Sequence, residues 1–317
     1  MVVLGIDIGG TMIKTALISQ NEVSFKKRFP TPSDKEQFQR LLSQMIRDYQ
    51  EIQSFHKIAF SVPGSVDQSG TVRFGGAVPY LDQLQLQSFL ELENFEVFVE
   101  NDAKAATSCE MKYGNLKGIQ QAAAIILGTG VGMGICINGQ LYKGTHMQAG
   151  EISFMIRDRQ ITGQNSFVGI GLSAVWLIKQ LAELLKVDNE GEQVFAALKD
   201  SENESAKALF HDYCKQVAFL CFNVQTLLDV EKIVIGGGIS QQEYLIQTIQ
   251  QAYQELFTVA PIIKKTLQPM TIEAAKFQAD ANLIGAAIKE NEDEKLISNR
   301  FFMGSFYQCL SSRRRLE

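Results

Sequence analysis

The 317-residue sequence has few of the residues that cross-link small proteins or bind transition metals. Its five cysteines are odd in number and scattered, so no disulfide framework is expected and a cytoplasmic location fits. The three histidines, His56, His146 and His211, lie far apart, and neither CxxC nor HExxH spacing occurs. The usual sequence patterns of a metal site are therefore absent.

Long apolar runs and a strong charge are missing too. No hydrophobic stretch approaches the roughly 20 residues that span a bilayer, and Asp7 interrupts the first one, so neither a membrane helix nor a secretory leader is expected. The formal net charge of -5 gives no attraction to nucleic acid or to an anionic membrane. The basic run 313–315 is read as a solvated tail. We therefore expect neither nucleic acid nor membrane as a partner.

What the sequence does contain is a repeated order of short strands, glycine corners and helices. Short apolar runs predict strands at 2–8, 12–19, 22–29, 57–62 and 97–100, and again at 122–128, 133–139 and 232–238. Helical spacing predicts helices at 34–53 and 203–229, and others that begin near 241 and near Asp280. Strand, glycine turn, strand occurs near residue 9 and again near 129. An α/β chain of two similar domains with a cleft between them is predicted.

The predicted domain limits follow from this repeat. The first domain covers 1–112 together with a returning helix at about 280–290, and the second covers 113–279. The segment 291–317 is aromatic-rich and has no clear periodicity. Its role is left open.

The first glycine corner lies in GIDIGGTMIK, residues 5–14, where Gly9, Gly10 and Thr11 follow Asp7. Such a corner can be an ordinary hairpin turn, or it can bring backbone N–H groups close to a ligand. Asp7 is a hard oxygen ligand of the kind that suits Mg²⁺. Lys14, on the outgoing strand, can face either phosphates or solvent.

A second corner, Gly128-Thr129-Gly130, pairs glycine with threonine in the same way. Two facing corners can hold a polyphosphate with backbone N–H groups. The competing nucleotide motifs fit poorly, because GxxxxGK[ST] is absent and GxGxxG fails at Met133. A strand rather than a helix follows the corner, so a dinucleotide-binding dehydrogenase is disfavoured.

The run Glu100-Asn101-Asp102-Ala103 comes directly after a short apolar strand. A carboxylate there, at the start of a helix, is well placed in a cleft. Asp102 can accept the proton of a hydroxyl that attacks a phosphate. Asn101 and Asp102 also suit a helix N-cap. The two roles are compatible, and the residues alone leave both open.

Seven motifs in order resemble the ROK family of sugar kinases and related repressors, part of the actin-like, hexokinase-like ATPase superfamily. They are DIGGT (7–11), SVPGSVD (61–67), ENDA (100–103), LGTGVG (127–132), AGE (149–151), IGGG (235–238) and DANLIGAA (280–287). The resemblance implies two actin-like (ribonuclease H-like) domains, each a mixed sheet flanked by helices, that close on ATP and a sugar.

The resemblance also implies residue roles. Asp7, Gly9, Gly10 and Thr11 would form the first phosphate loop, with Mg²⁺ near Asp7, and Gly128, Thr129 and Gly130 the second. Gly236, Gly237 and Gly238 would lie against the adenosine. Asn101, Asp102 and Glu151 would bind sugar hydroxyls, with Asp102 as general base, and the loop at Gly64 and Ser65 would close near the sugar.

Two departures from the family pattern matter. Phe154 stands where the family has a zinc-binding histidine. The family's cysteine motif would fall near 158–169, where this sequence has no cysteine, and Phe167 and Gly169 stand at its last cysteine and its sugar-binding glutamate. Zinc is therefore expected to be absent, and the sugar pocket is expected to have more room and fewer hydroxyl partners.

The zinc-less branch that resembles β-glucoside kinases shares this pattern, including Asp158-Arg159 and the loop GGAVPYLD at 75–82. The resemblance implies phosphorylation of the 6-hydroxyl of a disaccharide such as cellobiose, and family members are often homodimers. A glucokinase or an N-acetylmannosamine kinase is the alternative. A repressor is disfavoured, because Asp7 leaves no room before it for a DNA-binding domain. A non-enzymatic sugar sensor would be expected to lose Asp102.

Overall fold

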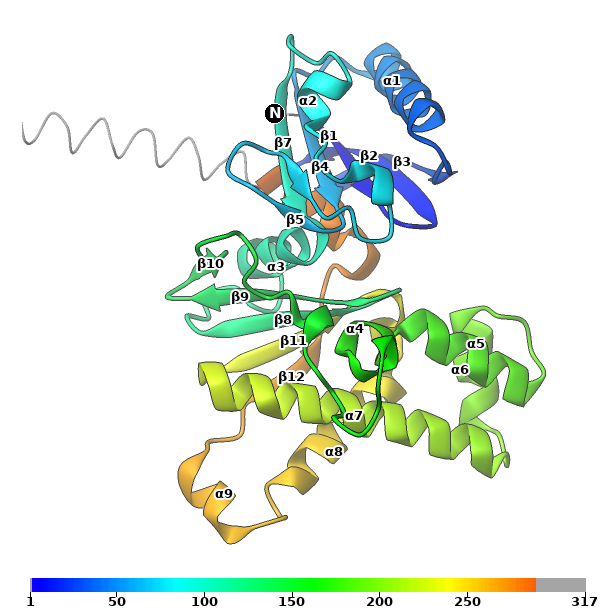
Figure 1. The fold of residues 1–317 in the computed structure, drawn as a ribbon, viewed down its shortest axis with the longest axis vertical. Helices are drawn as coiled ribbons and strands as arrows, with labels where there is room; N and C mark the ends of the chain where they lie inside the picture. The colour runs from blue at the N-terminus through cyan, green and yellow to red at the C-terminus, as the bar shows by residue number, and fades with distance from the viewer. Residues whose placement is uncertain (1, 289–317) are drawn as a thin grey trace, which may run out of the picture.

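The computed structural model describes residues 2–288, and it contains two five-stranded sheets with the same strand connectivity (Figure 1). The first sheet has the order β3-β2-β1-β4-β7, and the second has the order β10-β9-β8-β11-β12. Their strands are β1 (Val3–Ile8), β2 (Met12–Ser19), β3 (Glu22–Pro30), β4 (Lys57–Val62) and β7 (Glu96–Asn101), then β8 (Ala122–Leu127), β9 (Val131–Ile137), β10 (Gln140–Tyr142), β11 (Lys232–Gly236) and β12 (Thr271–Ala274).

In both sheets three strands form an antiparallel meander and two further strands add in parallel. The central strands β1 and β4 are buried along their whole length, which explains their nearly continuous apolar sequences. The polar exceptions are therefore informative, and Asp7 in β1 is one of them. Two mixed sheets flanked by helices confirm the predicted fold class.

Helices cover both faces of the first sheet. Helix α1 (Lys35–Ile52) begins where the Asp34 side chain accepts a hydrogen bond from the backbone N of Gln37 at 2.8 Å, and it buries an apolar stripe against the sheet. The opposite face packs against the helix 281–288, whose Leu283 and Ala286 share a core cluster with strand residues such as Ala59. The chain thus packs back against its first half at 281–288.

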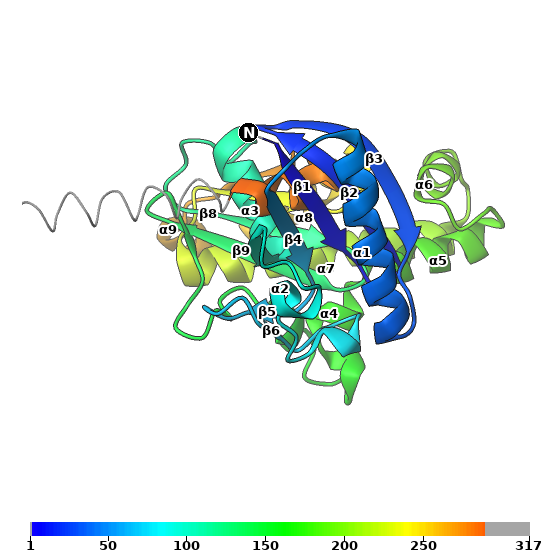
Figure 2. The same ribbon diagram turned by 90° about the horizontal axis from the view of Figure 1, so that it is seen from above.

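Helix α3 (Asp102–Tyr113) lies between the two sheets (Figures 1 and 2). It begins at the end of β7 in the first sheet and packs on β9 of the second. The contact is close because the facing residues are small: a Cβ added at Gly132 would lie 2.6 Å from the Cβ of Ala103. Any displacement of one sheet relative to the other therefore moves the start of α3.

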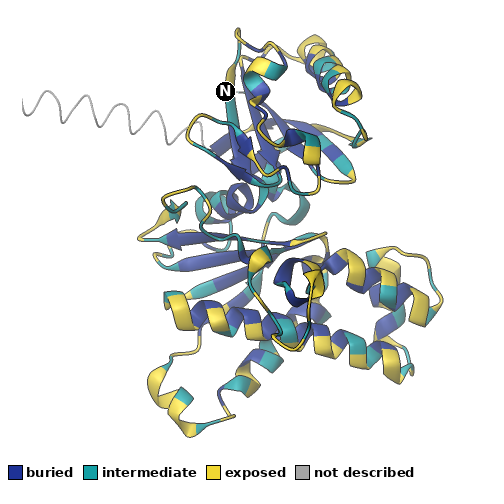
Figure 3. Ribbon diagram, viewed as in Figure 1, coloured by how far each residue is buried: buried dark blue, intermediate teal, exposed yellow. Residues whose placement is uncertain are grey.

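The second sheet packs against α7 (Glu204–Leu228) and α8 (Glu243–Leu256), whose apolar faces form the largest core cluster (Figure 3). The helices α5 (Ala174–Leu185) and α6 (Gly191–Lys199) extend this cluster. The shorter elements are β5 (Ser65–Val66), β6 (Val72–Arg73), α2 (Leu86–Phe89), α4 (Val168–Gly171) and α9 (Pro261–Thr266).

Most predicted elements agree with the structure to within two residues. The prediction for β9 began two residues late, because Val131 already pairs with Leu127 across the corner. The strand β11 ends at Gly236 rather than at 238, since Gly238–Gln241 form a 3-10 turn. The predicted domain limits remain predictions, and the segment 291–317 lies outside the described residues.

One segment, 168–185, is long and apolar enough to be tested as a membrane span. Half of it is buried inside the protein. It also comprises two separate helices, α4 and α5, with Ser173 capping the second. These features are those of a core segment, so it gives no reason to infer a membrane-spanning helix.

Candidate functional site

A cavity of about 260 Å³ lies between the two glycine corners. Its wall includes nine of the predicted binding and catalytic residues: Gly9, Gly10, Gly64, Asn101, Asp102, Gly128, Thr129, Gly130 and Glu151. These come from both halves of the chain, and the sequence separation between the first and last exceeds 140 residues. Asp7, Thr11, Ser65 and the glycines 236–238 are not part of this wall.

The first corner joins β1 to β2, and Asp7 lies directly beneath it, only 4% exposed. Its Oδ1 accepts hydrogen bonds from Ser61 Oγ at 2.8 Å and from Asn282 Nδ2 at 3.1 Å. Its Oδ2 pairs with Lys14 Nζ at 3.3 Å. The register of the hairpin explains this pair, because Asp7 and Lys14 are directly opposite each other across the strands. Lys14 thus faces the buried carboxylate.

The second corner joins β8 to β9 with a backbone bond from Gly128 N to Gly130 O of 3.0 Å. Thr129 and Gly130 are exposed at its tip, as Gly10 and Thr11 are at the first corner. The Ser153 hydroxyl supports it by donating to Val131 O at 2.8 Å. Both corners therefore offer a turn of backbone to the same cavity, and backbone N–H groups in such turns can hold anions.

Asp102 is the first residue of α3, and the N-cap is its neighbour Asn101. The Asn101 Oδ1 accepts from Lys104 N at 3.0 Å, while its Nδ2 donates to Gly64 O at 2.9 Å and to Asp102 Oδ1 at 3.0 Å. From the sequence, either residue could cap the helix, and Asp102 could also act as a base. The structure gives the capping bond to Asn101, so the Asp102 carboxylate is available to the cavity.

The hydrogen bonds that position the Asp102 carboxylate reach only one of its two oxygens within the described residues. Oδ1 accepts from Ala103 N at 2.7 Å as well as from Asn101 Nδ2. Within residues 2–288, the hydrogen bonds found for this carboxylate both reach Oδ1, which leaves Oδ2 for a ligand. Burial raises the pKa of Asp102 to about 6; the negative charges of Asp7 and then Glu151 add to this, while the Ala103 N–H and the Lys104 ammonium oppose it.

A pKa near 6 suits a general base at neutral pH, since the group is ionised yet has a usable proton affinity. Perturbed carboxylates of this kind concentrate at functional sites. The sequence prediction of Asp102 as a base is therefore consistent with its surroundings.

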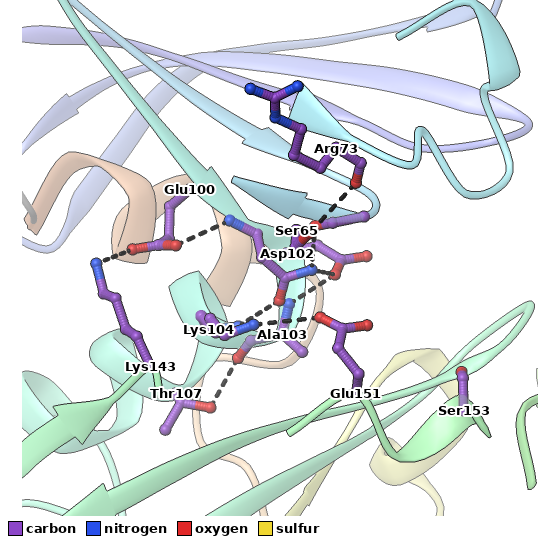
Figure 4. Close-up of polar contacts among 12 residues, drawn as sticks. Ser65, Arg73, Glu100, Asp102, Ala103, Lys104, Thr107, Lys143, Glu151 and Ser153 are labelled. Atoms are coloured by element: carbon purple, nitrogen blue, oxygen red, sulfur yellow. Dashed lines mark hydrogen bonds and ion pairs between the residues drawn. The ribbon is translucent and has the colours of Figure 1, made fainter. Parts of the chain in front are cut away.

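Two ion pairs join the halves beside Asp102 (Figure 4). Lys104, 1% exposed, directs its Nζ to Glu151 Oε1 at 3.2 Å. Lys143 pairs with Glu100 Oε2 at 2.7 Å. In each pair one residue belongs to the β7–α3 segment and the other to the second half. Lys104 was not among the predicted site residues. Its signal in the sequence is a lysine among small residues at the start of the helix that begins at Asp102.

The neighbouring residues Gly64 and Ser65 have different surroundings, and only Gly64 lines the cavity. Gly64 lines the cavity and accepts the Asn101 amide, whereas Ser65 is buried in β5 with its hydroxyl directed to Arg73 O at 3.3 Å (Figure 4). The hydroxyl of Ser65 thus serves the β5–β6 hairpin, and sugar contact from this loop is expected from Gly64 alone. Of the glycines 236–238, Gly236 ends β11 and the other two follow it. A Cβ at Gly237 would lie 2.0 Å from Leu127 O.

The predicted departures around 154–169 have a structural counterpart. Gly169 packs so closely on the 152–154 turn that an added Cβ would lie 2.6 Å from Ser153 Oγ. A longer side chain at 169 would therefore have to move that turn. Among residues 2–288, no group of three histidine, cysteine, aspartate or glutamate side chains is arranged to hold a metal ion. The absence of zinc stays a prediction.

The donor set near Asp7 suits Mg²⁺ delivered with a nucleotide. Mg²⁺ keeps most of its water and is usually bound through one or two carboxylates plus substrate phosphates. Asp7 supplies one carboxylate beneath the first corner. Its Oδ2 already pairs with Lys14, and its Oδ1 already accepts from Ser61 and Asn282. The residues fit an ion held chiefly by phosphate oxygens and water.

The sequence matches the ROK family over residues 3–291. A β-glucoside kinase of Listeria monocytogenes is 28% identical over 303 residues, covering 93% of this chain and 99% of that protein. An N-acetylmannosamine kinase of Vibrio cholerae is also 28% identical, covering 91% and 99%. Among solved structures, a ROK family protein from Streptococcus pneumoniae in complex with sucrose superimposes with a TM-score of 0.78 at 27% identity, covering 93% and 100%.

The family match, over 3–291, includes the residues of the cavity wall with both glycine corners and Asp102. The structural match agrees with the two mixed sheets described above. The chain therefore belongs to the ROK family, as a carbohydrate kinase with the actin-like fold.

Proposed function

We propose that this carbohydrate kinase transfers the γ-phosphoryl group of ATP to the 6-hydroxyl of a β-glucoside such as cellobiose. The observation that carries the proposal is Asp102, a carboxylate with a pKa of about 6 on the wall of a cavity bounded by two glycine corners. The 28% identity to a β-glucoside kinase supports the acceptor class. So do the aromatic residue and the glycine at positions 154 and 169.

Asp102 acts as the general base in this mechanism. Its Oδ2 takes the proton of the acceptor hydroxyl as the oxygen forms a bond to the γ-phosphorus of ATP. The bond from that phosphorus to the β–γ bridging oxygen breaks, and ADP leaves. The Ala103 N–H and the Asn101 amide hold Oδ1, which fixes the direction of Oδ2 and so the orientation of the attacking hydroxyl.

The remaining residues bind and orient the two substrates. The N–H groups of Gly9 and Gly128 already donate within their turns, so the backbone amides of residues 10, 11, 129 and 130 neutralise phosphate charge. Mg²⁺ near Asp7 would supply further neutralisation when it is bound with ATP. Glu151, held by Lys104, accepts hydrogen bonds from sugar hydroxyls. Approach of the two halves excludes water, which limits wasteful hydrolysis of ATP.

Two other acceptors and one other class of function are the alternatives. A glucokinase would favour a single glucose ring, and an N-acetylmannosamine kinase would need a donor for the acetamido group. A sugar-sensing regulator without catalysis has no need for a base, yet Asp102 is present and its pKa is raised. Homodimer formation and a cytoplasmic location remain predictions.

The test is ADP release coupled to a panel of acceptors: cellobiose, gentiobiose, glucose and N-acetylmannosamine. We expect kcat/KM to be greatest for a β-linked disaccharide, with the phosphate on its 6-hydroxyl by NMR of the product. A preference for glucose or N-acetylmannosamine would replace the acceptor but keep the kinase. The absence of ADP release with every sugar would favour the regulator.

Replacing Lys104 with Met is expected to move the acid limb of kcat/KM to higher pH. Asp102 is active only when ionised, so the rate rises with pH up to about 6 and then levels off. The Lys104 ammonium lowers the pKa of Asp102, and its loss therefore raises it. Below the pKa, each unit of displacement lowers the rate about tenfold.

The matched control is Lys143→Met, which removes the other ion pair between the halves and leaves Lys104 in place. Full pH profiles of both variants and of the parent protein decide the matter. A limb that moves equally in both variants would mean that general loosening of the interface, rather than the charge of Lys104, sets the pKa.

A further inference from the structure

Two exposed phenyl rings from different halves of the chain meet at the cavity. Phe74 is 60% exposed and Phe154 is 56% exposed, yet their ring centroids are 5.8 Å apart with an interplanar angle of 59°. Both line the cavity that contains Asp102. Large apolar side chains exposed together beside a binding site commonly contact a ligand. The mechanism proposed above makes no use of either ring.

Phe74 is held in an unfavourable backbone conformation. Its φ is +58°, in the left-handed region that costs a residue with a side chain about 1–2 kcal/mol. The conformation is fixed by a bond from Phe74 N to Asp82 Oδ1 of 2.7 Å and by contact of its carbonyl with Gly64. Strain retained in this way is typical of ligand clamps. The hairpin β5–β6 therefore presents this ring to the cavity in a defined position.

Phe154 is placed by the 3-10 turn Ile152–Phe154, which begins directly after Glu151. Its backbone N donates to Glu151 O at 3.3 Å, and its neighbour Ser153 is anchored to Val131. The ring is thus attached to the same short turn as the carboxylate that binds sugar hydroxyls in the proposed mechanism. A sugar at Glu151 has an aromatic surface beside it.

We propose that Phe74 and Phe154 form the subsite for the second ring of a β-glucoside, and so select two-ring acceptors over single sugars. This inference rests on the proposed function. A pyranose ring has an apolar face of C–H groups that packs on the negative face of a phenyl ring. Neither phenyl ring offers a hydrogen-bonding group, so the subsite selects for a ring rather than for a hydroxyl pattern, and an aryl β-glucoside is accepted as well as cellobiose.

The subsite also connects acceptor length to closure. Phe74 belongs to the first half of the chain and Phe154 to the second, so a second ring in contact with both holds the halves together. A single sugar bound at Glu151 and Asn101 lacks this bridge. The preference for two-ring acceptors should therefore depend on both phenyl rings and not on one of them alone.

The test compares cellobiose with methyl β-glucoside, which has the same linkage but no second ring. Phe74→Ala and Phe154→Ala are each expected to lower the ratio of kcat/KM for cellobiose to that for methyl β-glucoside by about tenfold, chiefly through KM; burial of a phenyl ring accounts for an effect of this size. Phe154→Tyr, which keeps the ring, should retain most of the ratio.

Phe25→Ala is the matched control. Phe25 is 55% exposed with a φ of +52°, like Phe74, but it lies in β3 and is not among the residues that line the cavity. Its substitution should leave the ratio unchanged. A ratio that Phe74→Ala and Phe154→Ala both leave unchanged would overturn the subsite while the β-glucoside kinase stands. Failure of the parent protein to phosphorylate either glucoside would instead overturn the proposed function.

Discussion

Replacing Asp102 with Asn is expected to lower kcat by at least about 10²-fold while the protein stays folded, the lower end of general-base effects. Asn keeps an oxygen for the bond from Ala103 N and the shape of the side chain, but it cannot take a proton. Hence positioning and phosphate binding persist, and only proton transfer is lost. Steady-state ADP release measures the loss, and the KM for ATP should change little.

Stability separates this catalytic role from a structural one. The pKa of Asp102 is raised from 3.8 to about 6, so its ionised form is disfavoured in the folded protein. Its contribution therefore lowers stability as pH rises from about 4 to 6, and at pH 7 the cost is in the range of about 1–3 kcal/mol. Asp102→Asn removes this cost and should unfold at the same or a higher urea concentration. Near-normal turnover, or marked destabilisation, would contradict the assignment.

Replacing Gly64 with Ala is expected to damage both stability and acceptor binding. The φ of Gly64 is +82°, and a Cβ there would lie 1.7 Å from Phe74 O and 2.9 Å from Arg73 O. Left-handed strain costs about 1–2 kcal/mol and overpacking about 1–3 kcal/mol, so a loss of about 2–5 kcal/mol in the free energy of unfolding is expected. Urea unfolding at neutral pH measures it.

The kinetic effect follows from what Gly64 touches. Its carbonyl accepts the Asn101 amide that also orients Asp102, and its close neighbour is Phe74. Movement of the loop displaces both, and kcat/KM for the acceptor should fall by at least about tenfold, since small errors in substrate positioning are costly.

Gly70→Ala is the matched control for this variant. Gly70 has a φ of +77°, but an added Cβ would meet nothing within 4 Å. The free energy of unfolding of this variant should fall only by the left-handed strain of about 1–2 kcal/mol, and its kinetics should be unchanged. Equal losses of unfolding free energy in the two variants would contradict the prediction. They would mean that the loop shifts to accept the methyl group added by Gly64→Ala, so that the predicted clash is relieved.

The strand pattern and the glycine corners were predictable because their signals are local. A strand buried on both faces must be apolar, and β4 was placed at 57–62 from its sequence alone. Helix α1 was similarly predicted from the spacing of Phe38, Leu42 and Met45 and from the cap at Asp34. Its limits agree with the structure to within one residue at each end.

Other features needed the pairing of distant residues. From the sequence, the Lys14 side chain could face either phosphates or solvent. The strand register places Lys14 opposite Asp7. The capping role shared between Asn101 and Asp102 was decided by the bond from Lys104 N to Asn101. Ser65 lies in a motif that indicates sugar contact, yet the β5–β6 hairpin engages its hydroxyl with Arg73. The partner of each of these side chains depends on the tertiary structure. The local sequence pattern alone is compatible with more than one partner.

By itself, therefore, the sequence determined that two similar halves each present a glycine corner and that a carboxylate lies just after the strand predicted at 97–100. These depend on hydrophobic alternation and on backbone freedom, which act over a few residues. Only the tertiary structure decided that Lys104 meets Glu151 and that Phe74 meets Phe154. Those contacts join residues 47 and 80 positions apart in the sequence. They exist because α3 packs between the two sheets and brings the halves together.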